Sequence, residues 1–393
     1  MMQIPFYVNK ILHKLHASGY EAFVVGGCVR DALMGVAPCD WDICTSALPN
    51  QVIDLFKEKH TVIPTGLQHG TVTIISEGNQ IEVTTYRSDG EYDDNRHPEK
   101  VVFLPSVEGD LARRDFTMNS IAYNPKDGLI DLFGGIADIH NKTIRCVGNP
   151  EKRFEEDALR IMRALRFAAV CGFEIEEETE TAVFEKKDLL KNISAERILS
   201  EFKKLILADK PSRIIIKYKE VFKVRIPIAN QNENIIIIDN MPKDIVLRIT
   251  SILSELSYDD AQRVLKNLKS DNEMIKSVCS VLNAKDIPIP QTKIEVKHIL
   301  NKLGCRSAKN LFSYWQAKGI KTNHILKFLD EIESNSECYT LDMMNLNGSD
   351  LIELGFEKGK DIGTILNRLL QKVINEELEN KKAALVEAAK SLL

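Results

Sequence analysis

The stretch that decides the fold is AFVVGGCVRDALMG, residues 22–35, a short apolar run followed by two glycines. The apolar run predicts a strand, Gly26 and Gly27 predict a tight turn, and the residues after them predict a short helix. Backbone N–H groups and the positive end of the helix dipole would converge where glycines let a ligand approach. The pattern indicates a triphosphate seat, with Arg30 on the first helical turn adding a charge-assisted contact. A glycine turn that serves packing alone is the alternative.

The next segment, CDWDI (39–43), carries two aspartates with one residue between them. Because side chains alternate along a strand, Asp40 and Asp42 would share one face, with Trp41 and Ile43 in the core. Neighbouring carboxylates repel each other, so a half-buried strand carries them together mainly to hold cations. Beside a phosphate seat, Mg²⁺ is the ion that fits. A solvated surface pair is the alternative.

A third carboxylate would complete a two-metal site, and Glu82 in IEVTTYR (81–87) is the candidate. Its alternative is an edge-strand acid paired with Arg87 or with a threonine. A site of this kind lets a hydroxyl displace pyrophosphate in line, with no covalent enzyme intermediate.

The chain changes character after Gly134 and Gly135. Before them, short β-branched runs bounded by Gly, Pro, Asn and Asp predict strands. These runs are AFVV (22–25), TVTII (71–75), IEVTTY (81–86) and VVFL (101–104). After them the periodicity is helical, as in SAERILSEFKKLILA (194–208), where Ser194 is the expected N-cap. We therefore expect an α+β protein, with a mixed-sheet head over residues 1–137 and helices thereafter.

Composition limits the protein class without choosing a partner. The chain has 393 residues, 44% of them hydrophobic, and no run of about eighteen apolar residues that would indicate a membrane span. The charged N-terminal segment does not resemble a signal peptide, so we expect a cytoplasmic protein. The eight cysteines form no CxxC pair, which argues against structural zinc and disulfides. The net charge of −5 means that a polyanion would have to meet local basic stripes.

The segment EEDALRIMRALRF (155–167) has helical periodicity. An apolar face is predicted at Ile161, Leu165 and Ala168. The opposite, outward face would carry Asp157 at its flank together with Arg160, Arg163 and Arg166. A solvated face with pairs such as Glu156 and Arg160 is the alternative.

Taken together, these segments resemble the class II branch of the polymerase β-like nucleotidyltransferases, which comprises CCA-adding enzymes and bacterial poly(A) polymerases. Five blocks match in order over about residues 22–170. They are GGCVRDALMG with DWDIC, IEVTTYR, SDGEYDDNRHPEKVVF, DLARRDFTMNSIAYN and EEDALRIMRALRFA. The resemblance implies a head (1–137), a neck that recognises the base (138–205), a body (206–265) and a tail that binds tRNA (266–393), and it leaves a homodimer open.

The resemblance also implies roles for single residues. Asp157 and Arg160 replace a nucleic-acid template: a carboxylate accepts from the amino group of cytosine or adenine while a guanidinium donates to the ring nitrogen. Uracil and guanine invert this pattern, which would leave buried groups unpaired. Further nucleotide contacts fall on Gly27, Arg30, Arg114, Arg163 and Arg166. Asp115 is expected to orient these arginines.

The polar segment SDGEYDDNRHPEK (88–100) is either a plain solvent loop or, by resemblance, the loop that helps to switch from C to A addition. Asp94 and Arg96 match the residues that this family carries in the loop. His97 departs from the arginine of many relatives, which leaves the contacts of the loop open.

The activity implied is sequential addition of C, C and A to the tRNA 3′ end from CTP and ATP, with catalytic Asp40, Asp42 and Glu82. A poly(A) polymerase or A-adding enzyme would share the head motifs, and a silent RNA-binding relative would have lost the aspartates. Transfer to a small molecule fits poorly with the long helical region. Basic residues on the later helices either follow an RNA backbone or form solvated faces. They are Lys203, Lys204, Lys293, Lys297, Lys302, Arg306 and Lys309.

Overall fold

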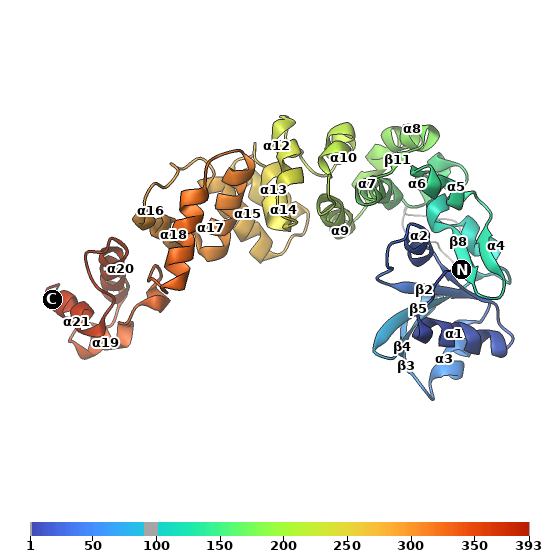
Figure 1. Ribbon diagram of the computed structural model, residues 1–393, viewed down its shortest axis with the longest axis horizontal. Helices are drawn as coiled ribbons and strands as arrows, with labels where there is room; N and C mark the ends of the chain where they lie inside the picture. The colour runs from blue at the N-terminus through green and yellow to red at the C-terminus, as the bar shows by residue number, and fades with distance from the viewer. Residues whose placement is uncertain (1, 90–100, 393) are drawn as a thin grey trace. The chain divides into compact units, whose positions relative to one another are not determined.

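The computed structural model describes residues 2–89 and 101–392. It forms two compact units, unit 1 (Met1–Pro227) and unit 2 (Ile228–Leu393). Unit 1 contains a mixed seven-stranded sheet and helices, and the described part of unit 2 is built from helices (Figure 1). The expected α+β class is confirmed. The division into head, neck, body and tail at residues 137, 205 and 265 stays a prediction.

The sheet of unit 1 has the strand order β3-β4-β5-β2-β1-β8-β9. Its strands are β1 Ala22–Val25, β2 Trp41–Thr45, β3 Thr61–Gly66, β4 Thr71–Ser76, β5 Asn79–Thr85, β8 Ile121–Asn124 and β9 Gly128–Asp131. All neighbouring pairs are antiparallel except β2 and β5, which run parallel. A separate two-stranded ribbon joins β6 Arg87–Asp89 to β7 Val101–Phe103. All four strands predicted from the sequence are present.

Apolar residues on the strands explain how the helices cover the sheet. Helices α1 (Phe6–Ala17) and α3 (Pro49–Phe56) lie together on one side of the sheet (Figure 1). On the other side a core of Phe23, Val25, Cys44 and Tyr86 packs against helix α4, which is Val107–Ala112. Helix α2 (Gly27–Leu33) follows β1 directly, as the glycine turn predicts. The sheet is therefore buried on both faces around β1 and β2.

The remaining helices of unit 1 follow the sheet. They are α5 Gly135–His140, α6 Pro150–Glu156, α7 Leu159–Cys171, α8 Glu177–Glu185, α9 Ala195–Ile206, α10 Ser212–Lys217 and α11 Lys219–Phe222. Short parallel strands β10 (Thr143–Ile144) and β11 (Glu174–Ile175) pair between them. Ser194 is the N-cap residue of α9, as predicted, although its side chain makes no capping hydrogen bond.

The segment predicted as one continuous helix at 155–167 is instead two helices. Asp157 has an extended backbone, with φ −141° and ψ 102°, between the end of α6 and the start of α7. Its Oδ1 accepts a hydrogen bond from the backbone N–H of Leu159 at 3.1 Å. A short acidic side chain can offer the backbone this alternative to a helical hydrogen bond, which explains the break.

The described part of unit 2 is a run of helices. Its elements are α12 Glu233–Ile236, α13 Ile245–Ile252, α14 Tyr258–Asn267, α15 Asn272–Ala284, α16 Lys293–Leu303, α17 Cys305–Ala317, α18 Asn323–Ser334, α19 Gly348–Glu353, α20 Lys360–Ile374 and α21 Lys382–Lys390. Thr292 and Asn347 form capping boxes at the starts of α16 and α19. In residues 2–89 and 101–392, no helix is long and apolar enough to cross a bilayer. The eight cysteines are free.

Several basic side chains of unit 2 are paired with acids of the same unit. Lys297 is only 4% exposed, and its Nζ lies 2.6 Å from Glu337 Oε2 and 3.0 Å from Glu376 Oε1. Lys293 also contacts Glu337, at 2.8 Å. Following an RNA backbone was one of two interpretations for these lysines, and for Lys297 burial excludes it. Lys297 instead ties α16 to the ends of α18 and α20.

Replacing Lys297 with Ala should lower the free energy of unfolding by about 2 kcal/mol, because α16 loses its buried contact with Glu337 and Glu376 while Lys293 stays beside both acids. Lys302→Ala, on the exposed side of the same helix, is the control and should change it by no more than about 0.5 kcal/mol. Urea unfolding followed by tryptophan fluorescence measures both, since Trp315 lies in unit 2. Equal effects of the two substitutions would show that the buried pairs add no stability.

Candidate active site

Two carboxylates stand side by side at the parallel junction of the sheet. The register of β2 with β5 pairs Asp42 directly with Glu82. Both residues are exposed, while Trp41 and Ile43 are buried, so the predicted alternation along β2 is confirmed. Asp40 is exposed and immediately precedes β2. The sheet therefore brings Glu82 to the aspartates over about forty residues of sequence.

The alternative interpretation of Glu82 as an edge-strand acid is wrong. Strand β5 lies inside the sheet, between β4 and β2. The Nη1 of Arg87 donates to the backbone carbonyl of His69. Glu82 has a cross-strand neighbour on each side: Thr73 on β4 and Asp42 on β2.

Like charges strain this group of acids. Partial burial, followed by the carboxylates of Glu82 and Asp40, raises the pKa of Asp42 to about 6, and Arg114 opposes the shift. Such a shift means that the ionised form is short of positive partners. Among the described residues, no three His, Cys, Asp or Glu side chains are grouped closely enough to enclose a metal ion by themselves.

The glycine turn makes room for an arginine. Gly26 has φ 82°, a left-handed conformation that favours glycine, and is the N-cap residue of α2. A Cβ at Gly26 would lie 3.0 Å from Nη1 of Arg114. The Nη2 of Arg114 donates to Oδ2 of Asp110 at 2.9 Å. Among the described residues, Nε of Arg114 is buried without a hydrogen-bond partner.

Asp110 is a supporting residue that sequence reasoning missed. It is fully buried on α4 and accepts hydrogen bonds from Arg113 and Arg114 at 2.7 and 2.9 Å. Burial opposes its ionisation, but the two guanidinium groups outweigh burial and hold the pKa of Asp110 below its usual value. The i,i+3 and i,i+4 spacing of DLARR would have revealed these pairs.

The side chain of Arg30 points back into the protein. It donates to Asp31 Oδ1 through Nε and Nη2, at 2.9 and 2.7 Å, and to Asn119 Oδ1 through Nη1, at 2.7 Å. Gly27 begins α2 one turn before Arg30. Gly27 and Arg30 therefore both lie at the start of α2, as predicted, and the guanidinium of Arg30 is held by Asp31 and Asn119.

Asp115 contacts one of the predicted arginines. Its Oδ2 lies 2.6 Å from Nη2 of Arg163, and its Oδ1 accepts from the backbone N–H of Phe116. Burial acts against the charge, but Arg163 lowers the pKa of Asp115 to about 2. Asp115 thus stays ionised at neutral pH and joins the DLARRD segment to α7.

The pair predicted to read the base is placed differently from expectation. Arg160 is 7% exposed and donates to the backbone carbonyls of Arg153 and Arg113, each at 3.1 Å, and to Glu156 at 2.5 Å. The predicted outward face is therefore wrong for Arg160. The Glu156 pair of the alternative interpretation exists, but its arginine is buried and only Glu156 is partly exposed.

Helix α9 supplies partners that the sequence analysis did not name. Arg197 donates to Asp157 Oδ2 at 2.8 Å, and Glu201 accepts from Nε of Arg166 at 2.5 Å. Arg197 and Glu201 are four residues apart on a helix, so both face α7. The four-residue spacing of Arg197 and Glu201 in the sequence could have indicated that both face the same neighbouring helix.

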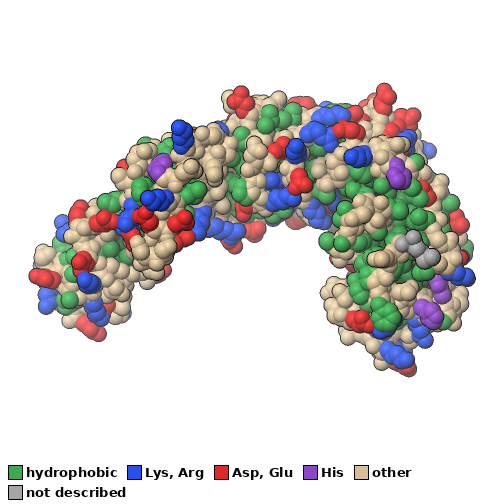
Figure 2. All heavy atoms as spheres, in the orientation of Figure 1, with side chains coloured by type: hydrophobic (Ala, Val, Ile, Leu, Met, Phe, Trp, Pro, Cys, Tyr) green, Lys and Arg blue, Asp and Glu red, His purple; other side chains and the backbone are tan. Residues whose placement is uncertain are grey.

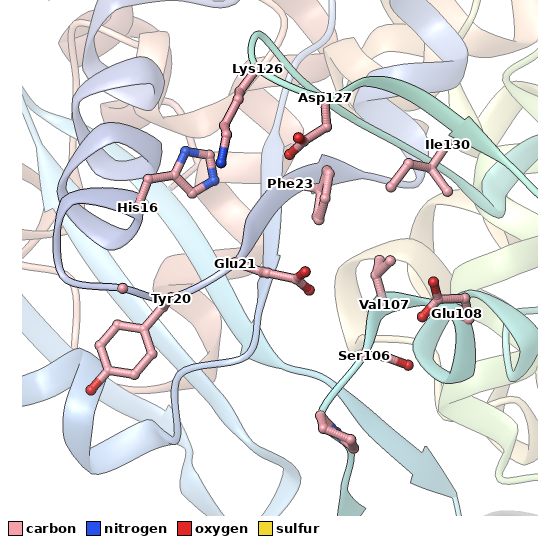
Figure 3. A pocket seen from close by; sticks show the side chains of 12 residues that line it. His16, Tyr20, Glu21, Phe23, Ser106, Val107, Glu108, Lys126, Asp127 and Ile130 are labelled. Carbon is pink, nitrogen blue, oxygen red and sulfur yellow. The ribbon is translucent and has the colours of Figure 1, made fainter.

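Asp94, Arg96 and His97 lie outside the described residues. A cavity of about 460 Å³ lies at the other end of β1 from the glycine turn, between α1, α4 and the β8–β9 turn (Figure 3). None of the residues predicted for the site lines this cavity.

A mixed sheet with neighbouring carboxylates, a glycine turn at a helix start and arginines on the following helices defines a nucleotidyltransferase. Comparison with known proteins agrees. Residues 22–145 match the poly A polymerase head domain. Residues 172–221 match the probable RNA and SrmB-binding site of polymerase A, and residues 245–389 match the putative domain 2 of tRNA nucleotidyltransferases.

Relatives match over nearly the whole chain. The CCA-adding enzyme of Ligilactobacillus salivarius is 35% identical over 98% of this chain and 95% of its own length. That of Pediococcus pentosaceus is 36% identical over 97% and 96%. The crystal structure of the Bacillus stearothermophilus CCA-adding enzyme in complex with CTP matches with a TM-score of 0.86 and 31% identity, over 100% of this chain and 98% of that one. The chain therefore belongs to the family of CCA-adding enzymes, the nucleotidyltransferases that add CCA to the tRNA 3′ end.

Replacing Asp42 with Asn should stabilise the metal-free protein at neutral pH. A pKa raised from 3.8 to about 6 on folding favours the protonated form, so ionisation costs stability as the pH rises through this window. Asp42 is exposed, so solvent screening reduces the gain to about 1 kcal/mol. The gain should be complete above pH 7 and absent below pH 4.

Urea unfolding in the presence of a chelator, between pH 4 and 8, measures this gain. Asp54→Asn, at an exposed aspartate of α3, serves as the control and should not stabilise the protein. A gain that does not depend on pH would contradict the electrostatic cause.

Proposed function

We propose that Asp40, Asp42 and Glu82 form the catalytic centre at which the 3′ hydroxyl of a tRNA displaces pyrophosphate from CTP, CTP and then ATP. The observation that carries the proposal is the register that pairs Asp42 with Glu82 one strand away from the glycine turn of α2. Carboxylates this close to a phosphate-binding turn can bind a cation that also binds the phosphates of a nucleotide.

The residues fit Mg²⁺. Asp40 and Asp42 would be the ligands, with Glu82 as the third carboxylate, and hard carboxylate oxygens are what this ion prefers. Burial and the neighbouring carboxylates raise the pKa of Asp42, and a cation would offset both effects by stabilising the ionised form. When bound, the metal would lower the pKa of the attacking hydroxyl and neutralise the triphosphate.

Around this centre the chain orients the nucleotide. The backbone N–H groups at Gly27 would meet the phosphates at the start of α2. Arg30 and Arg114 flank the same turn and would add charge-assisted contacts. Arg163 and Arg166 on α7 would brace the nucleotide from the other side. Their acid partners Asp115 and Glu201 hold them in place.

Base selection is assigned to Asp157 and Arg160. Asp157 would accept from the amino group of cytosine or adenine, and Arg160 would donate to the ring nitrogen. Arg160 is held by two backbone carbonyls and Glu156, so its guanidinium keeps one position. A fixed donor and a fixed acceptor explain how one pocket takes two bases and rejects the other two.

The tRNA would be held by unit 2 together with residues 172–221. On the face seen in Figure 2, basic and acidic side chains are interspersed over unit 2. This mixture agrees with recognition of RNA shape through local basic groups, given the net charge of −5. A cytoplasmic location and a homodimer stay predictions.

The test offers the protein tRNA transcripts that end before C, after C and after CC, with each nucleoside triphosphate in turn and Mg²⁺. We expect addition of CCA, CA and A, and no use of UTP or GTP. Asp42→Asn should lower kcat at least a thousandfold, because the catalytic centre loses a metal ligand, whereas Asp54→Asn should retain full activity. Addition of A alone to every transcript would indicate a poly(A) polymerase or A-adding enzyme instead.

Asp157→Asn should weaken base selection. An amide can donate as well as accept, so it tolerates the carbonyl oxygen that uracil presents in place of the amino group. We expect the ratio of kcat/KM for CTP over UTP to fall at least tenfold. Glu155→Gln, a neighbouring exposed acid, is the control. Unchanged discrimination in Asp157→Asn would rule out base reading by this carboxylate.

A further inference from the structure

A buried amide stands between two of the predicted arginines. Asn119, which ends the short 3₁₀ turn η2 (Thr117–Asn119), is 6% exposed. Its Oδ1 accepts from Nη1 of Arg30 at 2.7 Å, and its Nδ2 donates to Oδ1 of Asp115 at 3.2 Å. This orientation is the only one in which the amide oxygen meets a donor and the amide nitrogen meets an acceptor.

The connection continues to helix α7. The second carboxylate oxygen of Asp115 accepts from Nε of Arg163 at 2.7 Å. An unbroken series of hydrogen bonds therefore runs from Arg30 on α2 through Asn119 and Asp115 to Arg163. Both guanidinium groups also pack over the ring of Phe167, at 5.0 and 5.4 Å from its centre.

We propose that Asn119 is a positioning residue for nucleotide binding: it sets Arg30 directly and Arg163 through Asp115, so that the arginines of α2 and α7 are held together. The proposal rests on the nucleotide-binding roles proposed above for these two arginines. Asparagine suits the position because its short amide can accept from a guanidinium and donate to a carboxylate at once. An aspartate there would face Asp115 with a like charge.

This role has a signature of its own. The two arginines are assigned to the nucleotide without regard to its base, so loss of Asn119 should weaken CTP and ATP binding alike. Selection against UTP and GTP, which depends on Asp157, should stay as it is. Because the effect is on the binding of the ground state, KM should rise while kcat changes little.

The experiment measures kcat and KM for CTP and ATP with the full-length Asn119→Ala variant. We expect KM to rise about tenfold for both nucleotides, kcat to stay within about twofold, and CTP over UTP discrimination to be kept. Asn124→Ala is the matched control. Asn124 is also fully buried, and its Nδ2 also donates to an aspartate, Asp127, at 2.9 Å, but it contacts no arginine of the site. Its KM should stay within about twofold of the parent.

A double-mutant cycle separates positioning from general loss of structure. Because Asn119 acts partly through Arg30, Asn119→Ala should raise KM clearly less than tenfold further in an Arg30→Ala background, where only the route through Asp115 to Arg163 is left. Effects that multiply fully would overturn the proposal, as would an unchanged KM in Asn119→Ala. Should that variant fail to fold, Asn119→Asp keeps the volume and the acceptor but loses the donor. It should raise KM in the same way, and an unchanged KM again overturns the proposal.

The single variants of the two arginines tell the two levels of inference apart. If Arg30→Ala and Arg163→Ala leave KM unchanged, the nucleotide-binding roles are wrong, and the role of Asn119 falls with them. If these variants raise KM and Asn119→Ala does not, only the role of Asn119 is wrong.

Discussion

The parallel pairing of β2 with β5 is the contact on which the site depends. It places Asp42 beside Glu82 in a sheet whose other neighbouring strands are antiparallel. Partial burial and, after it, the neighbouring carboxylate of Glu82 raise the pKa of Asp42. The positive charge of Arg114 partly offsets this rise in pKa. The left-handed turn at Gly26 leaves room for Arg114, and Asp110 forms an ion pair with it. Under the proposed function, a bound cation would offset this excess of negative charge.

A second feature is that the arginines of the site are held by acids on other elements. Arg163 is held by Asp115 and Arg166 by Glu201, while Arg197 holds Asp157 from α9. Partners that fix a side chain in advance reduce the entropy lost when a ligand binds. Nucleotide recognition would then depend on a network of ion pairs and hydrogen bonds that spans α2, the DLARRD segment, α7 and α9. The network as a whole would matter more than any single contact in it.

Much of this was readable in the sequence, and the exceptions have identifiable causes. Alternation along a strand correctly predicted an exposed Asp42 between buried Trp41 and Ile43, because a period of two requires no knowledge of the partner strand. Helical periodicity failed at Asp157, where a side chain competes with the backbone for Leu159 and two helices replace one. The buried state of Lys297 was equally out of reach, since it depends on Glu337 and Glu376, forty and seventy-nine residues further along.

The sequence by itself determined the α+β class, the glycine turn, the paired aspartates and the family, because these follow from local periodicity and from motifs in a set order. Only the tertiary structure decided that Glu82 stands next to Asp42, that Arg160 faces inward, and that Arg197, Glu201 and Asn119 contact the predicted residues. These facts depend on strand order and on packing between distant helices. Local propensity carries no information about either, since a side chain's partners are chosen when separate elements meet.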